Sequence, residues 1–465
     1  MFNMFCRQMV ALFQSDQNLR QQSLGMQCCQ AACVRAAQST GTPSGIDNPD
    51  FLHKVLFPAG RKWSRPKSRC NDASLLLLYS GDNINAILEV AQTVNFDFSD
   101  EQRALQSEVQ RFLSDRADLS VARAVLDDDG AHFAEPVWRE MLELGWAGMA
   151  IPDQYGGVGL GYLELCVLAE ELGRSLAPVP FSSTIYLFTE AILRVANENV
   201  RAQTLPAVAA GEIIGTLAFA EGIGFPRPNR IKLRFENGRL QGEKWPVADA
   251  MIANHAVVLA ADENDEPCLC LLSLTQEGVE RRPLQSVDPT RGQGALVFNG
   301  AEAQRLGEAG ESAWKVFQQI LDAAAVLFAF EQVGGAASCL EQAIEFASER
   351  TAFGRTIGSF QAIKHKLADI YVGNQLAVSN AYYGAWALAS GSEELSLAAS
   401  VARVSAIQAF EAAASENIQV HGGMGFTWEA DCHLYLRRSR ALALVIGDAS
   451  LWKSQVANEF ERRVA

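Results

Sequence analysis

The chain has 465 residues, a formal net charge of −15 at pH 7 and a hydrophobic content of 49%. A chain of this length exceeds one compact core, so two or three packed units are expected. The acidic balance argues against nucleic-acid binding, because such binding depends on cationic side chains that neutralise phosphates. No run approaches the ~18 uninterrupted apolar residues of a membrane-spanning helix, so no integral membrane segment is predicted.

The cysteines do not form a metal-binding pattern. Ten are present, and five of them precede residue 93. Among the later ones only Cys268 and Cys270 are closely spaced, and a structural metal site of that kind needs a second pair. We therefore predict free thiols, no metal site and a reducing, cytoplasmic location.

Residues 1–93 differ from the rest of the chain in composition and hydrophobic periodicity. They contain patches rich in Gln and Cys, a basic run from Arg61 to Arg69 and no sustained hydrophobic period. We expect a non-homologous extension created by a gene start placed too far upstream, with translation beginning at Val94 from a non-ATG codon. A targeting peptide is an alternative, because Asp16 is the only acidic residue among the first 46. A disordered tail is a third possibility.

The segment 94–208 is predicted to be a helical domain. It opens on Ser99 and Gln102, a capping-box pattern that starts an amphipathic helix. Within the domain, the stretch 144–160 combines a proline with several closely spaced glycines, which predicts a turn-rich loop.

The segment 209–305 has a sequence pattern typical of β-strands. Apolar runs at 213–219, 252–259 and 269–272 are separated by turn residues, including Asn237 followed by Gly238. A small β-domain is predicted here. From residue 306 to 465 the sequence returns to long, Ala-rich helical patterns.

Two motifs stand out in the last segment. The first runs from Arg350 through Phe353 and Gly354 to Gln361, and it joins the end of one predicted helix to the start of the next. An Arg suits a phosphate ligand because its planar fork of donors matches phosphate oxygens. The second runs from Gln419 to Gly425, and its glycines allow backbone amides to approach a phosphate closely.

In this order the two motifs resemble the flavin-binding signatures of the acyl-CoA dehydrogenase family, and the resemblance covers nearly everything after Val94. It implies an α+β fold with an N-terminal helical domain, a central β-barrel-like domain and a C-terminal four-helix bundle. It also implies homo- or heterotetramers that assemble through the bundle.

The resemblance assigns most of the cofactor contacts to these motifs. Arg350 and Phe353 would meet the pyrophosphate and adenine of an FAD that belongs to the neighbouring subunit, and Gln361 would add a contact. His421 would contact the cofactor rather than act in catalysis. The second motif would bind the adenosine diphosphate through Gln419, His421, Gly422 and Gly423.

In the β-domain the resemblance is weaker. The backbone amides of Phe219 and Ala220 would face the edge of the flavin ring, although Ala220 replaces a hydroxyl residue and a Ser of the family pattern is absent. Trp245 would form an aromatic wall beside the ring. Arg291 is expected to contact the substrate or a partner. Phe219, Ala220 and Trp245 could equally be part of the core.

The catalytic base is missing from its usual places. Dehydrogenation of an acyl-CoA requires a carboxylate that removes the α-proton from the side opposite the flavin. Ile446 occupies the slot of the family's glutamate, and Ala324 occupies a second location that some members use. Asp448 and Glu331 are the nearest acids and are the predicted catalytic candidates, and the remaining alternative is that the chain has no base of its own.

The sequence thus predicts FAD-dependent α,β-dehydrogenation of an acyl-CoA, with electrons passed to an electron-transfer flavoprotein. One alternative is a partner subunit of a heteromeric acyl-CoA dehydrogenase, in which another chain supplies the base. A second alternative is a flavin oxidase or monooxygenase on the same fold.

Overall fold

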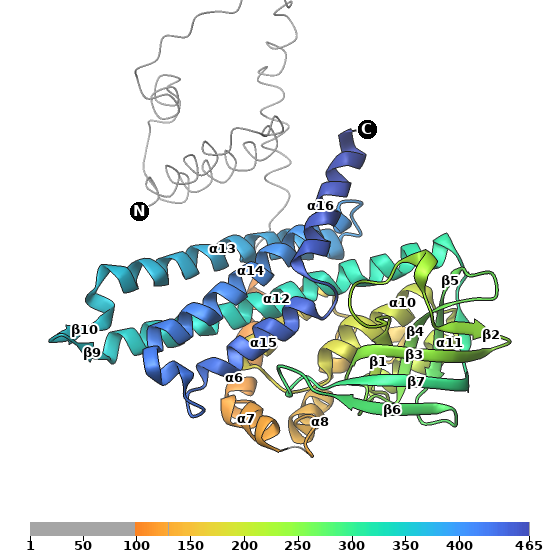
Figure 1. Ribbon diagram of the computed structural model, residues 1–465, viewed down its shortest axis with the longest axis horizontal. Coiled ribbons are helices and arrows are strands. Elements are labelled where there is room, and N and C mark those ends of the chain that lie inside the picture. The colour runs from red at the N-terminus through yellow and green to blue at the C-terminus, as the bar shows by residue number, and fades with distance from the viewer. Residues whose placement is uncertain (1–97, 129, 465) are drawn as a thin grey trace, which may run out of the picture. The chain divides into compact units, whose positions relative to one another are not determined.

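The computed structural model describes residues 98–128 and 130–464, and the predictions made for residues 1–93 lie outside the described residues. Helices come first along the described chain, followed by a sheet and then by a second set of helices (Figure 1). This order confirms the predicted fold class.

The first helical region begins at the predicted capping box. The backbone N–H of Ser99 donates to Gln102 Oε1 at 2.9 Å, and the backbone N–H of Gln102 donates to Ser99 Oγ at 3.2 Å. Both groups would otherwise lack an intrahelical partner, so the pair stabilises the helix start. The helices that follow are α6 (Asp100–Arg116), α7 (Leu119–Asp127), α8 (Glu135–Glu143), α9 (Tyr162–Ser175), the π-helical η4 (Ser182–Thr189), α10 (Glu190–Val195) and α11 (Glu198–Ala209).

The central region is a mixed sheet with the strand order β6-β7-β3-β2-β4-β5-β8, and β1 pairs in parallel with β4. The turn between β2 and β3 is the predicted one, because Asn237 and Gly238 have φ of 50° and 74° as a tight hairpin requires. The strands are β1 (Gly215–Ala218), β2 (Arg234–Glu236), β3 (Arg239–Ala248), β4 (His255–Ala261), β5 (Pro267–Ser273), β6 (Val279–Leu284), β7 (Gln293–Glu302) and β8 (Gln304–Leu306).

The C-terminal region packs α12, α13 and α14 side by side, with α15 and α16 against α14 (Figure 1). A short hairpin of two strands connects α12 to α13. The elements are α12 (Glu311–Glu349), β9 (Thr351–Ala352), β10 (Arg355–Thr356), α13 (Gln361–Ala389), α14 (Leu395–His421), the short helix η7 (Gly422–Phe426), α15 (Cys432–Leu444) and α16 (Ala449–Val464).

Helix α12 is the core helix of the molecule. It is long and apolar enough to cross a membrane, but 89% of its most apolar window is buried inside the fold. Its contact with α9 depends on glycines, since a Cβ on Gly173 would lie 1.8 Å from the carbonyl oxygen of Glu331, and a Cβ on Gly334 would lie 1.9 Å from that of Glu170. A helix that is apolar on all sides is expected to be buried in this way.

Candidate functional site

The first flavin motif forms the hairpin at the tip of the helical bundle (Figure 1). Helix α12 ends at Glu349, and Phe353 and Gly354 make the turn with φ of 53° and 79°. A positive φ is unusual for a bulky aromatic residue, and here it holds a ring that is 96% exposed. Arg350 is also exposed, and it has no ion-pair partner within residues 98–128 and 130–464.

The second motif leaves open space above its first two glycines. Gly422 ends α14 with φ of 59°, and a Cβ on Gly422 or Gly423 would meet nothing within 4 Å. A Cβ on Gly425, in contrast, would lie 2.5 Å from the carbonyl oxygen of Ile418. Gly425 is therefore required for packing, whereas the two preceding glycines leave their backbone accessible to a ligand.

His421 is held against the protein. Its Nδ1 lies 2.8 Å from the carbonyl oxygen of Asn417, and its ring stacks on Phe346 with the centroids 4.2 Å apart. This side chain helps to fix the end of α14 beside α12. The contact of His421 with a cofactor stays a prediction.

Both motifs lie at the same end of the bundle. Ala347 and Val420 belong to one small apolar cluster, and Ile357 from the hairpin region packs against it. Gln361 and Gln419 are exposed near this cluster, on the first turn of α13 and the last turn of α14. The structure thus brings the predicted nucleotide-binding residues together on one exposed surface, which we call the bundle-end surface.

The predicted flavin-edge residues lie elsewhere, where β1 leaves the sheet. Trp245 donates its backbone N–H to the carbonyl oxygen of Ala220 at 2.9 Å and accepts from Gly222 N–H at 2.7 Å. Trp245 is 40% exposed, and its indole stands over Gly222, where an added Cβ would lie 3.0 Å from the ring. Phe219 and Ala220 themselves are buried.

A buried lysine fixes this segment. Lys244 donates from Nζ to the carbonyl oxygen of Phe219 at 3.2 Å and to Glu221 Oε1 at 2.7 Å. Burial lowers the pKa of Lys244 to about 8, although the carboxylate of Glu221 opposes the shift. The ion pair therefore anchors the loop that follows β1 to strand β3.

The two groups of predicted flavin contacts are far apart within one chain. Helix α12 links them, because Phe317 near its start contacts Phe219 and its last residue, Glu349, precedes the hairpin. At 1.5 Å per residue this part of α12 spans roughly 50 Å, which is farther than one FAD molecule can reach. The two predicted groups of flavin contacts therefore cannot serve one FAD molecule within one chain.

The base slots hold apolar side chains in the structure as well as in the sequence. Ile446 and Ala324 are both fully buried. Asp448 is exposed, and its Oδ1 accepts from the backbone N–H of Leu451 at 2.9 Å at the start of α16. Asp448 therefore caps a helix, which is a structural use of the carboxylate.

The position of Glu331 does not suit a base. Its side chain is fully buried, forms an ion pair with Arg291 and lies 3.6 Å from Arg438 Nη1. Two guanidinium groups lie within ion-pair distance of the Glu331 side chain, and no solvent reaches it. In this structure the Glu331 carboxylate makes structural contacts, and its catalytic role stays a prediction.

Arg291 likewise differs from its prediction, because it is buried rather than available to a substrate or partner. It donates from Nη1 to Ser182 Oγ at 2.6 Å as well as pairing with Glu331. Burial by itself would lower the pKa of Arg291, but the carboxylates of Glu331 and Asp249 outweigh burial and hold it above its ordinary value. This arginine connects all three regions of the fold.

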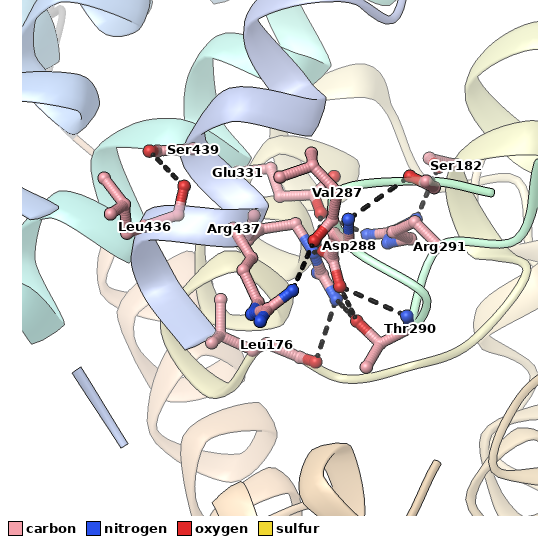
Figure 2. Close-up of polar contacts among 12 residues, drawn as sticks. Leu176, Ser182, Val287, Asp288, Thr290, Arg291, Glu331, Leu436, Arg437 and Ser439 are labelled. Atoms are coloured by element: carbon pink, nitrogen blue, oxygen red, sulfur yellow. Dashed lines mark hydrogen bonds and ion pairs between the residues drawn. The ribbon is translucent and has the colours of Figure 1, made fainter. Parts of the chain in front are cut away.

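A second ion pair completes the arrangement. Arg438 on α15 donates from Nε to Asp288 Oδ2 at 2.5 Å and from Nη2 to Thr290 Oγ1 at 2.8 Å. Figure 2 shows Asp288, Thr290, Arg291 and Glu331 gathered where the loop before β7 meets the helices. We call Asp288, Arg291, Glu331 and Arg438 the interdomain charge cluster. The sequence singled out Arg291 and Glu331 separately, but nothing in it indicated that they form an ion pair or that Arg438 on α15 lies beside them.

A third buried arginine lies beside this cluster. Arg403 on α14 donates to Gln332 Oε1 at 2.5 Å and to the carbonyl oxygen of Leu442, and its guanidinium lies 5.5 Å from the centre of the Phe328 ring. Burial lowers the pKa of Arg403 to about 9, against the attraction of Glu331. Arg403 and the charge cluster together hold α15, the helix that leads into the base-slot loop.

A metal-binding group or a surface hollow in the described residues could also form a site. Within 98–128 and 130–464, no group of three or more His, Cys, Asp or Glu could hold a metal ion. A surface hollow of about 590 Å³ lies on the sheet beside Arg239 and His255, and another of about 280 Å³ lies between α6 and Trp146. Neither hollow includes a predicted flavin contact.

The described chain thus has a helical region, a central sheet and a second helical region. Two of these regions match known domains of one protein family. Residues 99–212 match the acyl-CoA dehydrogenase N-terminal domain, and residues 312–459 match the acyl-CoA dehydrogenase C-terminal domain. The chain is 32% identical over 351 residues to acyl-CoA dehydrogenase IpdE2 of Mycolicibacterium smegmatis, covering 75% of this chain and 95% of that protein. The chain therefore belongs to the acyl-CoA dehydrogenase family of oxidoreductases.

Solved structures share the fold. A variant of the Tcur3481-Tcur3483 steroid ACAD superposes with a TM-score of 0.71 at 28% identity, covering 78% of this chain and 98% of that chain. The ChsE4-ChsE5 complex of Mycobacterium tuberculosis superposes with a TM-score of 0.72 at 23% identity, covering 79% of this chain and 99% of that chain.

Proposed function

We propose that this chain is one subunit of an FAD-dependent acyl-CoA dehydrogenase and that a second, different chain supplies the catalytic carboxylate. The observation that carries the proposal is the buried Ile446 in the base slot, together with Ala324 in the alternative location. The other two acids considered, Asp448 and Glu331, cap a helix and join an ion-pair cluster. The similarity to the Tcur3481-Tcur3483 steroid ACAD, which is named for two components, adds support.

The bundle-end surface fits the adenosine diphosphate part of FAD, the cofactor of this family. Arg350 offers an exposed guanidinium for the pyrophosphate, and the exposed ring of Phe353 offers a stacking face for the adenine. The open backbone at Gly422 and Gly423 can accept a close phosphate. Because the flavin edge lies at the other end of α12, these groups would serve an FAD whose ring lies in the neighbouring subunit.

In the proposed reaction, FAD would supply a hydride acceptor for the β-carbon of the acyl thioester. The residues of this chain would bind and orient. Arg350 would neutralise phosphate charge on the cofactor that reacts in the partner. Phe219, Ala220 and Trp245 would border the flavin edge of this chain's own cofactor half-site, which takes no part in that reaction. The α-proton would leave to a carboxylate of the partner. Electrons would then pass to an electron-transfer flavoprotein, and assembly through the bundle would give a tetramer.

A second candidate is a self-sufficient dehydrogenase with Asp448 as the base. The observation in its favour is that Asp448 is exposed and directly follows Gly447 in the base-slot loop. A carboxylate there could turn toward a substrate at the expense of the helix cap.

The test is anaerobic mixing of the purified protein with straight-chain, branched and steroid-ring acyl-CoAs while the flavin absorbance is recorded. We expect no bleaching by this chain alone, and bleaching after a co-purifying dehydrogenase subunit with an intact base is added. Bleaching by the homogeneous chain would reject the partner requirement and favour Asp448. Oxygen consumption without an electron-transfer protein would instead indicate a flavin oxidase.

A further inference from the structure

The space between the flavin-edge strand and the base-slot loop contains the chain's own aromatic side chains. Removal of a proton from one face of a substrate and of hydride from the other requires the acyl group to lie between base and flavin. In this chain those two sides are Phe219 with Ala220, and the loop that contains Ile446 and Gly447. Whatever occupies the space between them decides whether an acyl group can enter.

Phe225 spans that space. Its ring centroid lies 6.0 Å from that of Phe219, and its Cδ2 lies 3.5 Å from the position of a Cβ on Gly447. One side chain is therefore in van der Waals range of both walls. A substrate acyl chain would have to occupy the volume that this ring fills.

Two further rings support Phe225 from α12. Phe317 is fully buried, with its centroid 5.6 Å from Phe219 and 6.2 Å from Phe225, and Trp314 lies 5.3 Å from Phe317. Aromatic rings at these separations attract one another beyond their simple burial. The four rings form a continuous aromatic cluster that joins the sheet to the start of the core helix.

The loop that carries Phe225 turns back so that the ring packs against the protein. It is anchored before the turn by Glu221, which accepts from Lys244 and from the backbone N–H of Leu233. Gly222 and Gly224 then adopt φ of 105° and 95°, conformations that side-chain-bearing residues avoid. Ile223 at the apex is fully exposed, so the partial burial of Phe225 is a specific feature of the loop.

We propose that Phe225 is a built-in plug that closes this chain's own acyl-thioester gap, so that the substrate of the assembly is bound in the partner subunit. The proposal rests on the proposed function and deepens it, because it assigns the two halves of the reaction to different chains. This chain contributes the bundle-end surface to the partner's cofactor, and the partner contributes both the base and the substrate gap.

The test measures binding alone, with octanoyl-CoA as the probe and the full chain as the protein. Calorimetric titration compares the unmodified protein with Phe225→Ala and with Phe112→Ala, a control that removes another partly buried ring, packed 5.0 Å from Trp146. We expect no saturable binding to the unmodified protein or to the control. Phe225→Ala should bind the probe saturably, with a Kd at least about tenfold below the highest probe concentration at which the unmodified protein shows no saturation.

The fluorescence of Trp314 tests whether the probe binds beside the aromatic cluster. A probe beside Phe317 should change the emission of Trp314, and Trp314→Phe in the Phe225→Ala background should remove that change. If Phe225→Ala does not fold, Phe225→Leu retains apolar contact while shortening the side chain, and the unmodified protein remains informative. Saturable binding to the unmodified protein with a Trp314-dependent signal would overturn the plug, and so would folded Phe225 variants that bind no more tightly.

The plug and the proposed function fail in different ways. An unmodified chain that binds octanoyl-CoA without bleaching any flavin contradicts the plug and leaves the need for a partner's base intact. An unmodified chain that bleaches a bound flavin alone contradicts both.

Discussion

The two ends of α12 differ in how far their surroundings are open to a ligand. At the bundle end, Phe353 is exposed, Arg350 is unpaired among the described residues, and the first glycines of the second motif leave open space. At the sheet end, Phe225 fills the gap and Ile446 occupies the base slot. The comparison teaches that one chain can expose the residues of the family's flavin motifs at one end of a helix while apolar side chains fill the base slot at the other end.

Glu331→Ala should have the largest effect, because it leaves Arg291 and Arg438 buried without their carboxylate. We expect a loss of ~3–5 kcal/mol of unfolding free energy, measured by denaturant unfolding. The matched control is Glu341→Ala on the same helix, since Glu341 is largely exposed and pairs with Arg174, and its loss should cost less than ~1 kcal/mol. Equal effects of the two variants would show that the interdomain charge cluster does not support the fold.

Arg350→Ala tests the bundle-end surface. Loss of a charge-assisted phosphate contact should weaken FAD retention by the assembled enzyme by ~1.5–3 kcal/mol, about 10-fold to 150-fold in Kd. Arg355→Ala is the control, because Arg355 lies in the same hairpin with its guanidinium 4.0 Å from the Phe360 ring. Unchanged FAD content in Arg350→Ala would remove this surface from the cofactor site.

Lys244 should make the unfolding free energy depend on pH. Its pKa in the folded chain is about 8, below the ordinary value of 10.5. Between these pH values the unfolded chain binds the proton that the folded chain has released, so this group's contribution to stability rises with pH. The unfolding free energy of the protein relative to Lys244→Met should therefore increase from pH 8 to 10.5, by up to ~1.4 kcal/mol per pH unit. A flat or falling difference would contradict the assigned burial.

Asp448→Ala should have the smallest effect. Loss of the cap on α16 should cost ~1 kcal/mol of unfolding free energy. Reduction of flavin in the assembly with the partner should be unchanged, because the proposed base is on the other chain. A loss of reduction rate far larger than the loss of stability would identify Asp448 as the base after all.

Local patterns were predictable from the sequence because their causes are local. The capping box at Ser99 and Gln102 and the hairpin turn at Asn237 and Gly238 depend on side chains within a few residues. The predicted strand at 213–219 became β1 (Gly215–Ala218), and the one at 252–259 became β4 (His255–Ala261). Such shifts at strand ends reflect pairing with neighbours, which local texture does not specify.

The roles of Glu331 and Arg291 could not be predicted in the same way. Their ion pair joins residues 40 positions apart, and Arg438 adds a third helix to the cluster. Because the energy of a buried charge depends on what surrounds it in three dimensions, the same glutamate read alone resembled a possible base.

The sequence by itself determined the family, the order of helices, sheet and helices, and the apolar residues in the base slots, since each is carried by residue identity at fixed spacing. Only the tertiary structure decided that α12 separates the two groups of predicted flavin contacts, that Glu331 is bound by arginines, and that the Phe225 ring lies beside Gly447. Those outcomes depend on which distant surfaces meet when the core packs, and packing is decided by the whole chain at once.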